Sequence, residues 1–545
     1  MELLKTLYRK YPELLLLALG SLVFLTNLDA LFVNIMEARN FITAREMMVH
    51  DNWIFTTMNE LPRYQKPPLP TWLTAISARL FGIESVYAYR LPAALASLFL
   101  LLIFYKMQLQ AGVLKALAFG TGIILMTSFY VFFAGREGQW DIFTHSFMIG
   151  SIYYFIKTFA GTENRLKNSI IAGLFLGASL MSKGPVSLYA LFLPFLISYS
   201  IVYKFEGFQK GWKYLAIFIA IGLISGSWWS ILIHYHDAEE ISRVAALESG
   251  RWFNYNIRPM WYYWSFFTQS GIWTIPSLMG LFYWHLKTRV SNLKAYRFFF
   301  FWTLFSLILL SIIPEKKSRY LLPVLIPLAA TTSFYVEYAI RNFRDNFSKW
   351  ERFPIYLNFI LLALISIAAP IFLYISLEEY LGEMMGIFIF TGILLFALGA
   401  GFIYGLIKKK IPFLFSLQAG MMIFIIAVGS LFLKPIDPSR NSPNVAHLKS
   451  FAQQEDLEVY DYYNLMPELI WHYGSSIPTI EEPTSHPGEN KFILLVIPED
   501  YPDWKTDFGD YTIEKHGVLD LNPTYDKGKN LRLVREMYVL TKQAP

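Results

Sequence analysis

Cysteine is absent from all 545 residues of the chain. Its absence excludes a disulfide framework and thiolate chemistry, and it leaves no mark of the redox compartment. Charged residues are also scarce, at 16% of the chain, whereas soluble domains contain about one quarter. Hydrophobic residues make up 55% and aromatic residues 18%, and the mean hydropathy is +0.38. These values predict an integral membrane protein.

Apolar runs near spanning length recur through the first 433 residues. A membrane-spanning helix needs roughly 20 apolar residues, and by that measure we count about thirteen runs. They lie near residues 12–31, 84–105, 114–133, 140–159, 168–182, 185–203, 213–235, 262–285, 297–313, 319–339, 354–376, 384–406 and 412–433. The fifth run is short, so the count could change by one. The first run is too long for the apolar part of a signal peptide, and we interpret it as an uncleaved span.

Lysine and arginine residues set the expected orientation, because cytoplasmic connections carry most of them. Their distribution places the N-terminus in the cytoplasm and, with an odd number of spans, the C-terminus outside, which for a protein of a bacterial inner membrane is the periplasm. The bases are scattered between spans, so the net charge of +6 does not indicate a nucleic-acid partner. Two outer connections carry bases against the bias: Arg136 and the cluster Lys316, Lys317 and Arg319. An anionic ligand on that side would explain them.

Residues 434–545 lack a spanning run and are rich in Asp, Glu, Pro and Tyr. We expect strands at Leu457–Tyr463, Phe492–Ile497, Tyr511–Lys515 and Leu531–Leu540, and helices at Val445–Gln454 and Met466–Tyr473. The sequence therefore predicts two domains. Residues 1–433 form the membrane domain, with a long first outer loop at 32–83, and residues 434–545 form a small soluble α/β domain on the outer face.

The stretch from Met36 to Leu73 combines acids, bases and aromatic rings between two apolar runs. Long connections are usually functional or disordered. Here Glu37 to Met48 predicts a helix with one apolar and one charged face, and three prolines between residues 67 and 70 stiffen the segment after Tyr64 and Lys66. A rigid, charged, aromatic loop at a membrane surface favours a site for an anionic, lipid-borne substrate.

Several motifs carry a resemblance to a known superfamily. They are EARNFITARE, NW, RYQKPPLPTWL, ARLFG and YRLPAAL within residues 34–97, then REGQWD (136–141), SKGP (182–185) and KSRYLLPVLIP (317–327). In this order they resemble the glycosyltransferases of the protein O-mannosyltransferase and aminoarabinose (lipid A) transferase superfamily. The resemblance implies a GT-C fold, a polyprenyl-phosphate sugar donor and an inverting transfer at the outer face of the membrane.

The sequence departs from the superfamily pattern at two positions, of which the second concerns a metal site. Met36 precedes Glu37 where an Asp-Glu pair is usual, and Gln65 precedes the loop lysine where the lipid A enzymes often have a glutamate that helps to hold a metal. His234 and His236, with Asp237, are the other metal candidates, but their spacing puts the two rings on different faces of a helix. We therefore predict no metal site and no cofactor, and a divalent metal stays an open alternative.

Six residues are candidate ligands of the donor phosphate. A departing polyprenyl phosphate gains negative charge in the transition state and needs cations that are already in position. The N-terminal end of the tenth span adds its own partial positive charge. The alternatives are an interfacial lysine whose charge reaches water, and a solvated turn. The six are Lys66, Tyr64, Arg319, Lys317, Tyr320 and Arg136.

Three further basic residues, Arg39, Lys183 and Arg258, are candidates for binding either substrate. For Arg258 the alternative is interfacial anchoring beside tryptophans. Attack on an anomeric carbon also needs a base, for which a positioned carboxylate is the usual choice. Glu37, directly after the first span, and Asp141, at the start of the fourth, are the catalytic candidates, and structural ion pairs with Arg39 and Arg136 are the alternative.

The expected function is transfer of one sugar from a polyprenyl-phosphate donor to lipid A, another glycolipid or glycan, or a protein hydroxyl. A polytopic transporter or flippase of lipid-linked intermediates is the alternative. Transporters often show internal repeats and broken spans at matching positions. No repeat is evident here, and the candidate residues cluster in outer loops rather than at mid-span.

Overall fold

The computed structural model describes residues 8–161, 163–206, 208, 210–343, 347–437, 444–463, 466–481, 487–497, 499–523 and 528–543. The chain forms two compact units. We call Met1–Leu28, Tyr64–Leu73 and Arg90–Gly429 the helical unit, and Asp29–Arg63, Thr74–Tyr89 and Ser430–Pro545 the mixed unit. Helices α4 (Leu69–Phe81) and α5 (Val86–Gln110) contribute residues to both.

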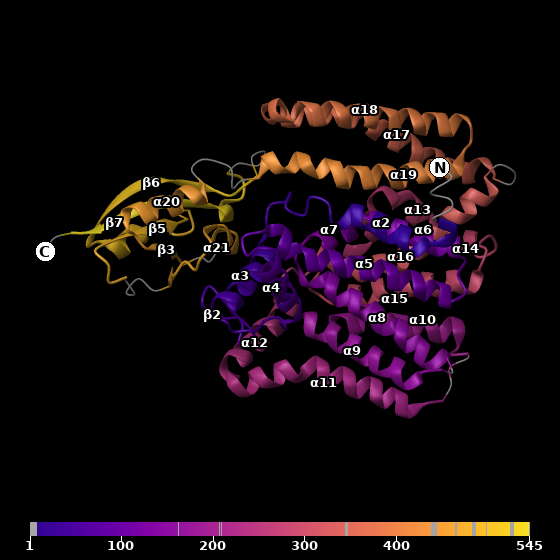
Figure 1. Ribbon diagram of the computed structural model, residues 1–545, viewed down its shortest axis with the longest axis horizontal. Coiled ribbons are helices and arrows are strands. Elements are labelled where there is room, and N and C mark those ends of the chain that lie inside the picture. The colour runs from indigo at the N-terminus through magenta and orange to yellow at the C-terminus, as the bar shows by residue number, and fades with distance from the viewer. Residues whose placement is uncertain are drawn as a thin grey trace. The chain divides into compact units, whose positions relative to one another are not determined.

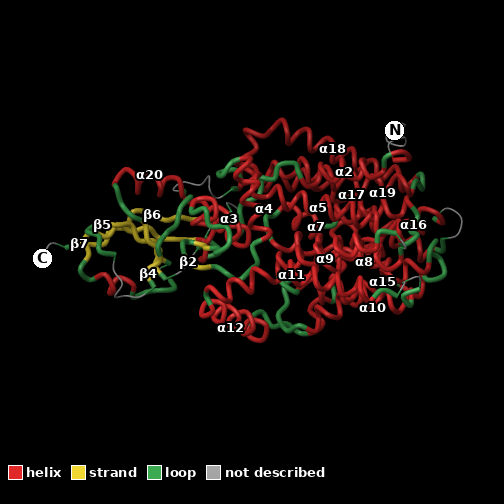
Figure 2. The backbone as a smooth tube through the Cα atoms, turned by 60° about the horizontal axis from the view of Figure 1, so that its bottom comes forward, coloured by secondary structure: helices red, strands yellow, loops and turns green. Residues whose placement is uncertain are grey.

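Helices occur at every apolar run of the helical unit (Figures 1 and 2). They are α2 (Pro12–Phe24), α6 (Lys115–Thr127), α7 (Phe129–Arg136), α8 (Trp140–Ala160), α9 (Arg165–Lys183), η1 (Leu188–Phe192), α10 (Leu193–Tyr203), α11 (Trp212–His236), α12 (Ala238–Asn254), α15 (Leu293–Ile312), η4 (Ser318–Leu321), α16 (Leu322–Asn342), α17 (Lys349–Leu377), α18 (Leu381–Ile407) and α19 (Ile411–Phe424). The predicted helical membrane fold is confirmed.

Among the described residues, seven helical segments, α5 included, are long and apolar enough to cross a membrane, or eight if α6 and α7, bent by 66°, form one span. The predicted number of about thirteen spans therefore stays a prediction. The run at 262–285 is the most interrupted, with short pieces η2 (Met260–Tyr263), η3 (Phe266–Trp273), α13 (Thr274–Gly280) and α14 (Tyr283–Leu286). Its break has a local cause, because Gly271 adopts a positive φ of 66° inside η3.

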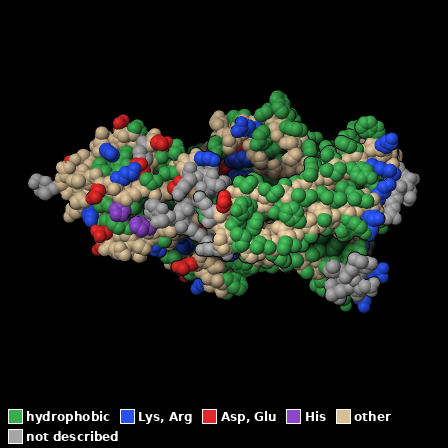
Figure 3. All heavy atoms as spheres, turned by 90° about the horizontal axis from the view of Figure 1, so that it is seen from above, with side chains coloured by type: hydrophobic (Ala, Val, Ile, Leu, Met, Phe, Trp, Pro, Cys, Tyr) green, Lys and Arg blue, Asp and Glu red, His purple; other side chains and the backbone are tan. Residues whose placement is uncertain are grey.

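The outer flank of the helical unit is apolar, as expected for a surface in contact with lipid (Figure 3). Large side chains of α17 and α18 such as Leu364, Phe372, Phe390 and Ile393 are more than half exposed. In water such a continuous apolar surface would be unfavourable. Figure 3 also shows lysine and arginine side chains gathered at one end of this unit.

Small residues let the interior helices approach closely. Helix α9 packs between α8 and α11. A Cβ added at Gly177 of α9 would lie 1.9 Å from the Ser225 Oγ of α11, and one added at Gly226 would lie 2.8 Å from the Leu180 side chain. Glycine contacts of this kind bring membrane helices together where the hydrophobic effect cannot.

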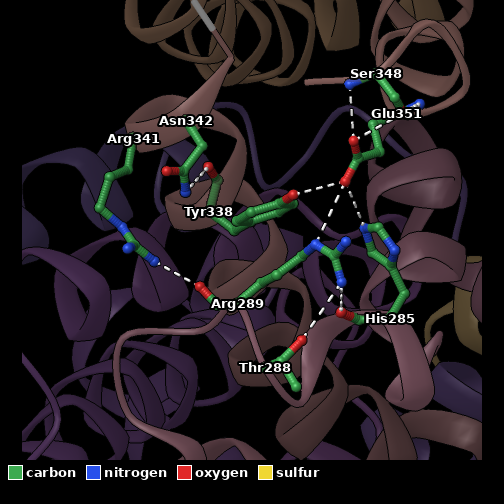
Figure 4. A network of polar contacts seen from close by, with 8 residues as sticks. All are labelled: His285, Thr288, Arg289, Tyr338, Arg341, Asn342, Ser348 and Glu351. Atoms are coloured by element: carbon green, nitrogen blue, oxygen red, sulfur yellow. Dashed lines mark hydrogen bonds and ion pairs between the residues drawn. The ribbon is translucent and has the colours of Figure 1, made fainter. Parts of the chain in front are cut away.

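Glu351 is the centre of a polar network at the start of α17 (Figure 4). Its carboxylate accepts hydrogen bonds from the Ser348 backbone and hydroxyl, both at 2.8 Å, and from the Tyr338 hydroxyl at 2.8 Å. It also pairs with His285 Nε2 at 3.3 Å and Arg289 Nε at 3.4 Å. The network joins α14, α16 and α17 at one end of the helical unit.

Replacing Glu351 by alanine should destabilise the protein without touching the candidate site. The change removes a capping box and leaves the Tyr338 hydroxyl without its acceptor, which costs about 1–3 kcal/mol. A lower thermal unfolding midpoint in detergent, with unchanged lipid binding, is the expected result. An unchanged midpoint would mean that the network contributes nothing.

The mixed unit contains a five-stranded sheet in the order β4-β3-β5-β7-β6. Its strands are β3 (Val459–Tyr462), β4 (Thr479–Ile480), β5 (Lys491–Val496), β6 (Tyr511–Asp520) and β7 (Val534–Lys542), and its helices are α20 (Val445–Glu455) and α21 (Pro467–Tyr473). Strands β4 and β5 run parallel to β3, whereas β7 is antiparallel to both β5 and β6. The α/β character predicted for residues 434–545 is confirmed.

The first-loop helix forms as α3 (Ile35–Val49), which begins in a capping box between Asn34 and Glu37. Several of the charged side chains of this helix are buried. Arg45 is buried and donates to the carbonyls of Trp471 and Ile470, each at 3.1 Å. Glu46 is also buried, and it accepts from the short hairpin of β1 (Thr57–Met58) and β2 (Leu61–Pro62). The Arg45 and Glu46 side chains thus form hydrogen bonds with backbone groups of the mixed unit.

Candidate active site

A cavity of about 330 Å³ lies within the helical unit. Five separate connections or helix ends contribute charged side chains to its wall: Lys66, Asp141, Lys183, Glu248 and Glu315. The other lining residues are His145, Pro185, Val186, Tyr189, Ala190, Ser249, Leu310, Ile313, Tyr320 and Pro323. A mostly apolar cavity with a few convergent polar groups is typical of a ligand site.

Lys66 reaches this cavity from the segment before α4. Its Nζ lies 3.7 Å from Glu248 Oε2 of α12, and the two side chains are 23% and 33% exposed. A long, partly exposed ion pair contributes about 0–1 kcal/mol. An incoming anion could therefore replace Glu248 as the partner of Lys66 at little cost in free energy. Of the two lysines that line the cavity, Lys66 is the one that can change its partner more easily.

Tyr64 lies two residues before Lys66 and is buried, with its ring edge against Trp229 of α11. Burial raises the pKa of the Tyr64 hydroxyl, and the carboxylates of Asp237 and Glu240 raise it further. The phenol therefore stays protonated at neutral pH. It supports the segment that carries Lys66 and does not line the cavity.

Asp141 and Lys183 form a buried ion pair between the start of α8 and the end of α9. The SKGP turn ends α9 directly after Lys183. Its Gly184 has φ of 70° and ψ of −153°, a conformation that essentially only glycine adopts. Pro185 then fixes the next residue. Because this pair is buried, removing one partner would leave an uncompensated charge, which makes Lys183 far less exchangeable than Lys66.

The residues before α16 form a second polar cluster on the cavity wall. Glu315 is buried, lies 2.7 Å from the Lys317 ammonium and accepts a hydrogen bond of 3.0 Å from the Tyr320 hydroxyl. The guanidinium of Arg319 lies over the Tyr320 ring at 5.8 Å. Within the described residues the Arg319 Nε makes no hydrogen bond. Arg319 thus keeps donor capacity for an anion at this helix start.

Other predicted bases perform structural tasks. Lys316 is buried, not solvated, and its ammonium donates to the carbonyls of Arg258 at 3.0 Å and Ile313 at 2.6 Å. Arg136 is also buried, and it donates to the carbonyls of Val23 in the last turn of α2 and of Asn27 just after it. A phosphate role for Arg136 stays a prediction without support from this geometry. The Arg258 side chain is exposed and does not line the cavity.

Glu37 and Arg39 lie in the mixed unit. The Glu37 carboxylate is fully buried and accepts from the Asn34 amide side chain at 3.0 Å, as part of the capping box of α3. Arg39 is half-buried. Burial, and then the charge of Arg39, lower the pKa of Arg63 to about 9. The catalytic role of Glu37 stays a prediction, and its capping role is observed.

The comparisons with known proteins agree with this architecture. Residues 65–229 match the family of dolichyl-phosphate-mannose-protein mannosyltransferases. The chain is 26% identical over 317 residues to an undecaprenyl phosphate-alpha-4-amino-4-deoxy-L-arabinose arabinosyl transferase of Proteus mirabilis, covering 55% of each chain. It is 25% identical over 365 residues to the enzyme of the same name from Shewanella sediminis, covering 62% of this chain and 61% of that one. The alignments thus span little more than half the length of these curated relatives.

The fold is shared over almost the whole length. The crystal structure of ArnT from Cupriavidus metallidurans bound to undecaprenyl phosphate superposes with a TM-score of 0.69, covering 97% of this chain and 98% of that chain at 16% identity. The chain is thus similar to the protein mannosyltransferases over residues 65–229 and to the aminoarabinose transferases over more than half of its length. Its fold is the GT-C fold that the motifs predicted.

Superfamily motifs did not identify three acidic or imidazole residues of the cavity. Glu248 sits on an amphipathic helix whose charges look like a solvated face, and Glu315 follows a proline at the end of an apolar run. His145 lies inside an apolar run. Local sequence carries no signal for any of them, because only the packing of distant connections makes them neighbours.

A metal site is not formed by the candidate histidines. His234 and His236 are exposed in the last turn of α11. Among the residues that the structure describes, no group of three His, Asp or Glu side chains could hold a metal ion. At position 65, where the resemblance often implies a glutamate, the neutral amide of Gln65 offers a metal ion a carbonyl oxygen but no negative charge.

Proposed function

We propose that this protein transfers one sugar from a polyprenyl-phosphate carrier to an acceptor hydroxyl or similar nucleophile at the outer face of the membrane, with inversion at the anomeric carbon. The observation that carries the proposal is the cavity where Lys66, the Asp141–Lys183 pair and the Glu315 cluster converge. The superfamily relationship supports the same donor class. Lipid A, another glycolipid or glycan, and a protein hydroxyl are the candidate acceptors.

The cation arrangement suits a phosphate leaving group. When the bond between the anomeric carbon and the phosphate oxygen breaks, negative charge grows on the phosphate, and fixed cations stabilise that charge most in a water-poor cavity. Lys66 can exchange Glu248 for the phosphate, and Arg319 lies in the cluster at η4 with an Nε that makes no hydrogen bond to any residue the structure describes. We assign these two residues as the donor-phosphate ligands, with Lys317 and Tyr320 holding Glu315 beside them.

Mass spectrometry of lipid and protein fractions from cells with and without the gene tests this function. A sugar unit that is missing from one lipid or protein class in the deletion strain, and that returns on complementation, is the expected result. It would name the sugar and the acceptor together. Identical fractions, combined with a changed distribution of lipid-linked sugars across the membrane, would support a flippase instead.

The proposed orientation gains support from contacts among the connections. Those expected on the cytoplasmic side lie together: Lys294 Nζ pairs with Glu206 at 2.6 Å, the Asn292 amide donates to the Gly112 carbonyl at 3.3 Å, and Arg341 donates to the Arg289 carbonyl at 2.7 Å. The charged cavity residues all come from connections or helix ends expected outside. The contacts therefore agree with the proposed alternation of the spans, because connections expected on the same side of the membrane contact one another.

A cytoplasm-only reporter fused to the C-terminus should stay silent, because the tail is proposed to lie in the periplasm. The same reporter inserted after Phe343, between α16 and α17, should be active. Activity of the C-terminal fusion would overturn the odd number of spans.

A further inference from the structure

His145 lies in the wall of the cavity but has no role in the chemistry described so far. It follows Asp141 by four residues on α8, so the two side chains share one helix face. The ring is 2% exposed and lines the cavity. One turn of helix places it roughly 6 Å farther along α8 from the end where the charged residues gather.

The Nδ1 atom of this ring is buried and makes no hydrogen bond within the described residues. Most buried polar atoms have a partner, and leaving one unsatisfied costs about 1–3 kcal/mol. The nearby charged groups are already committed to one another, as Asp141 is to Lys183 and Glu315 is to Lys317. A ligand that enters the cavity is therefore the natural partner of His145.

The chemistry around the ring favours a neutral polar group over a phosphate. The Asp141 carboxylate lies on the same helix face and would repel an anion. The lysines and Arg319 already supply stronger and permanent positive charge for the phosphate. A sugar hydroxyl or amino group, by contrast, can donate to or accept from an imidazole nitrogen.

We propose that His145 binds the sugar of the donor, through a hydrogen bond between Nδ1 and a hydroxyl or amino group of that sugar. The proposal rests on the proposed function, since it presupposes a polyprenyl-phosphate sugar in this cavity. It makes His145 a determinant of which sugar is transferred. Such a site rejects a sugar that lacks the matching group more strongly than an apolar wall would.

The test compares binding of bare undecaprenyl phosphate with binding of undecaprenyl phosphate carrying mannose, glucose or 4-amino-4-deoxy-L-arabinose. The protein is the full chain in lipid nanodiscs, as wild type, His145→Phe, His145→Asn and Ser146→Ala. Phenylalanine keeps the ring and removes both nitrogens, whereas asparagine places an amide near the position of Nδ1. Ser146→Ala is the matched control, because Ser146 is equally buried on α8 and does not line the cavity.

Wild type should bind at least one sugar-bearing lipid more tightly than the bare carrier. In His145→Phe the affinity for the sugar-bearing lipid should fall about tenfold, and the affinity for the bare carrier should not change. His145→Asn should keep part of the gain, and Ser146→Ala should keep all of it.

Three results would overturn the role of His145: no sugar-dependent gain in wild type, an undiminished gain in His145→Phe, or equal losses for bare and sugar-bearing lipids. If His145→Phe does not fold, loss of the gain in a folded His145→Asn would also contradict the Nδ1 contact. Failure of wild type to bind even bare undecaprenyl phosphate would instead overturn the proposed function itself.

Discussion

Replacing Lys66 by alanine is expected to lower kcat/KM for sugar transfer by at least about 100-fold, the usual effect of removing one group that stabilises charge in a transition state. The protein should stay folded, because the Lys66–Glu248 pair is long and partly exposed. Lys66→Arg should recover part of the activity, since it keeps the charge but changes the geometry. Steady-state kinetics with purified protein and a polyprenyl-phosphate sugar would measure the effect.

Glu248→Gln is the matched control for Lys66. It removes the same ion pair from the other side but keeps the lysine and its charge in place. We expect equal or tighter donor binding and little loss of turnover. Near-normal turnover in Lys66→Ala would remove the phosphate role of Lys66. Equal losses in Lys66→Ala and Glu248→Gln would show that the ion pair itself matters and not the cation.

Replacing a candidate base by its amide should also lower the turnover of the enzyme strongly. If Asp141 takes the proton of the acceptor, Asp141→Asn should lower kcat by about 10²–10⁴ while donor binding stays nearly constant. If Glu37 is the base, Glu37→Gln should do so instead. The test is clean at Glu37, because a glutamine can still accept the Asn34 hydrogen bond that caps α3.

At Asp141 a second comparison separates chemistry from structure. Lys183→Ala breaks the same buried pair but leaves the carboxylate, so it should reduce stability by about 3–5 kcal/mol. Asp141→Asn removes the negative charge and keeps a hydrogen-bond acceptor for Lys183, and its thermal midpoint should be much closer to wild type. Substantial transfer by both Glu37→Gln and Asp141→Asn would mean that no carboxylate base of this pair operates.

Periodicity and composition were enough to predict the elements. The apolar runs coincide with helices, and the helix expected at Glu37–Met48 forms within α3. The strands expected at Leu457–Tyr463, Phe492–Ile497, Tyr511–Lys515 and Leu531–Leu540 are present as β3, β5, β6 and β7. These features depend on neighbours within about four residues, which sequence displays directly. The bent pair α6–α7 and the fragments between residues 260 and 286 depend on packing, so the span count could not be read in the same way.

The site was predictable only in part, because its partners are distant in sequence. Motifs pointed to Lys66, Asp141, Lys183 and Tyr320, which the structure brings to one cavity. They gave no indication that Glu248 would pair with Lys66. Nor did they indicate that buried carbonyls within the helical unit would accept hydrogen bonds from Lys316 and Arg136. A basic residue on the unexpected side of a membrane protein thus has a structural explanation as well as a functional one.

The most direct test is transfer by the purified protein in nanodiscs, supplied with an extract of polyprenyl-phosphate sugars and with membrane lipids from the source cell. Free polyprenyl phosphate and a glycosylated acceptor should appear together and in equal amounts, and both should vanish in Lys66→Ala. Consumption of no donor by wild type, or movement of intact donor across the bilayer without release of polyprenyl phosphate, would contradict the account.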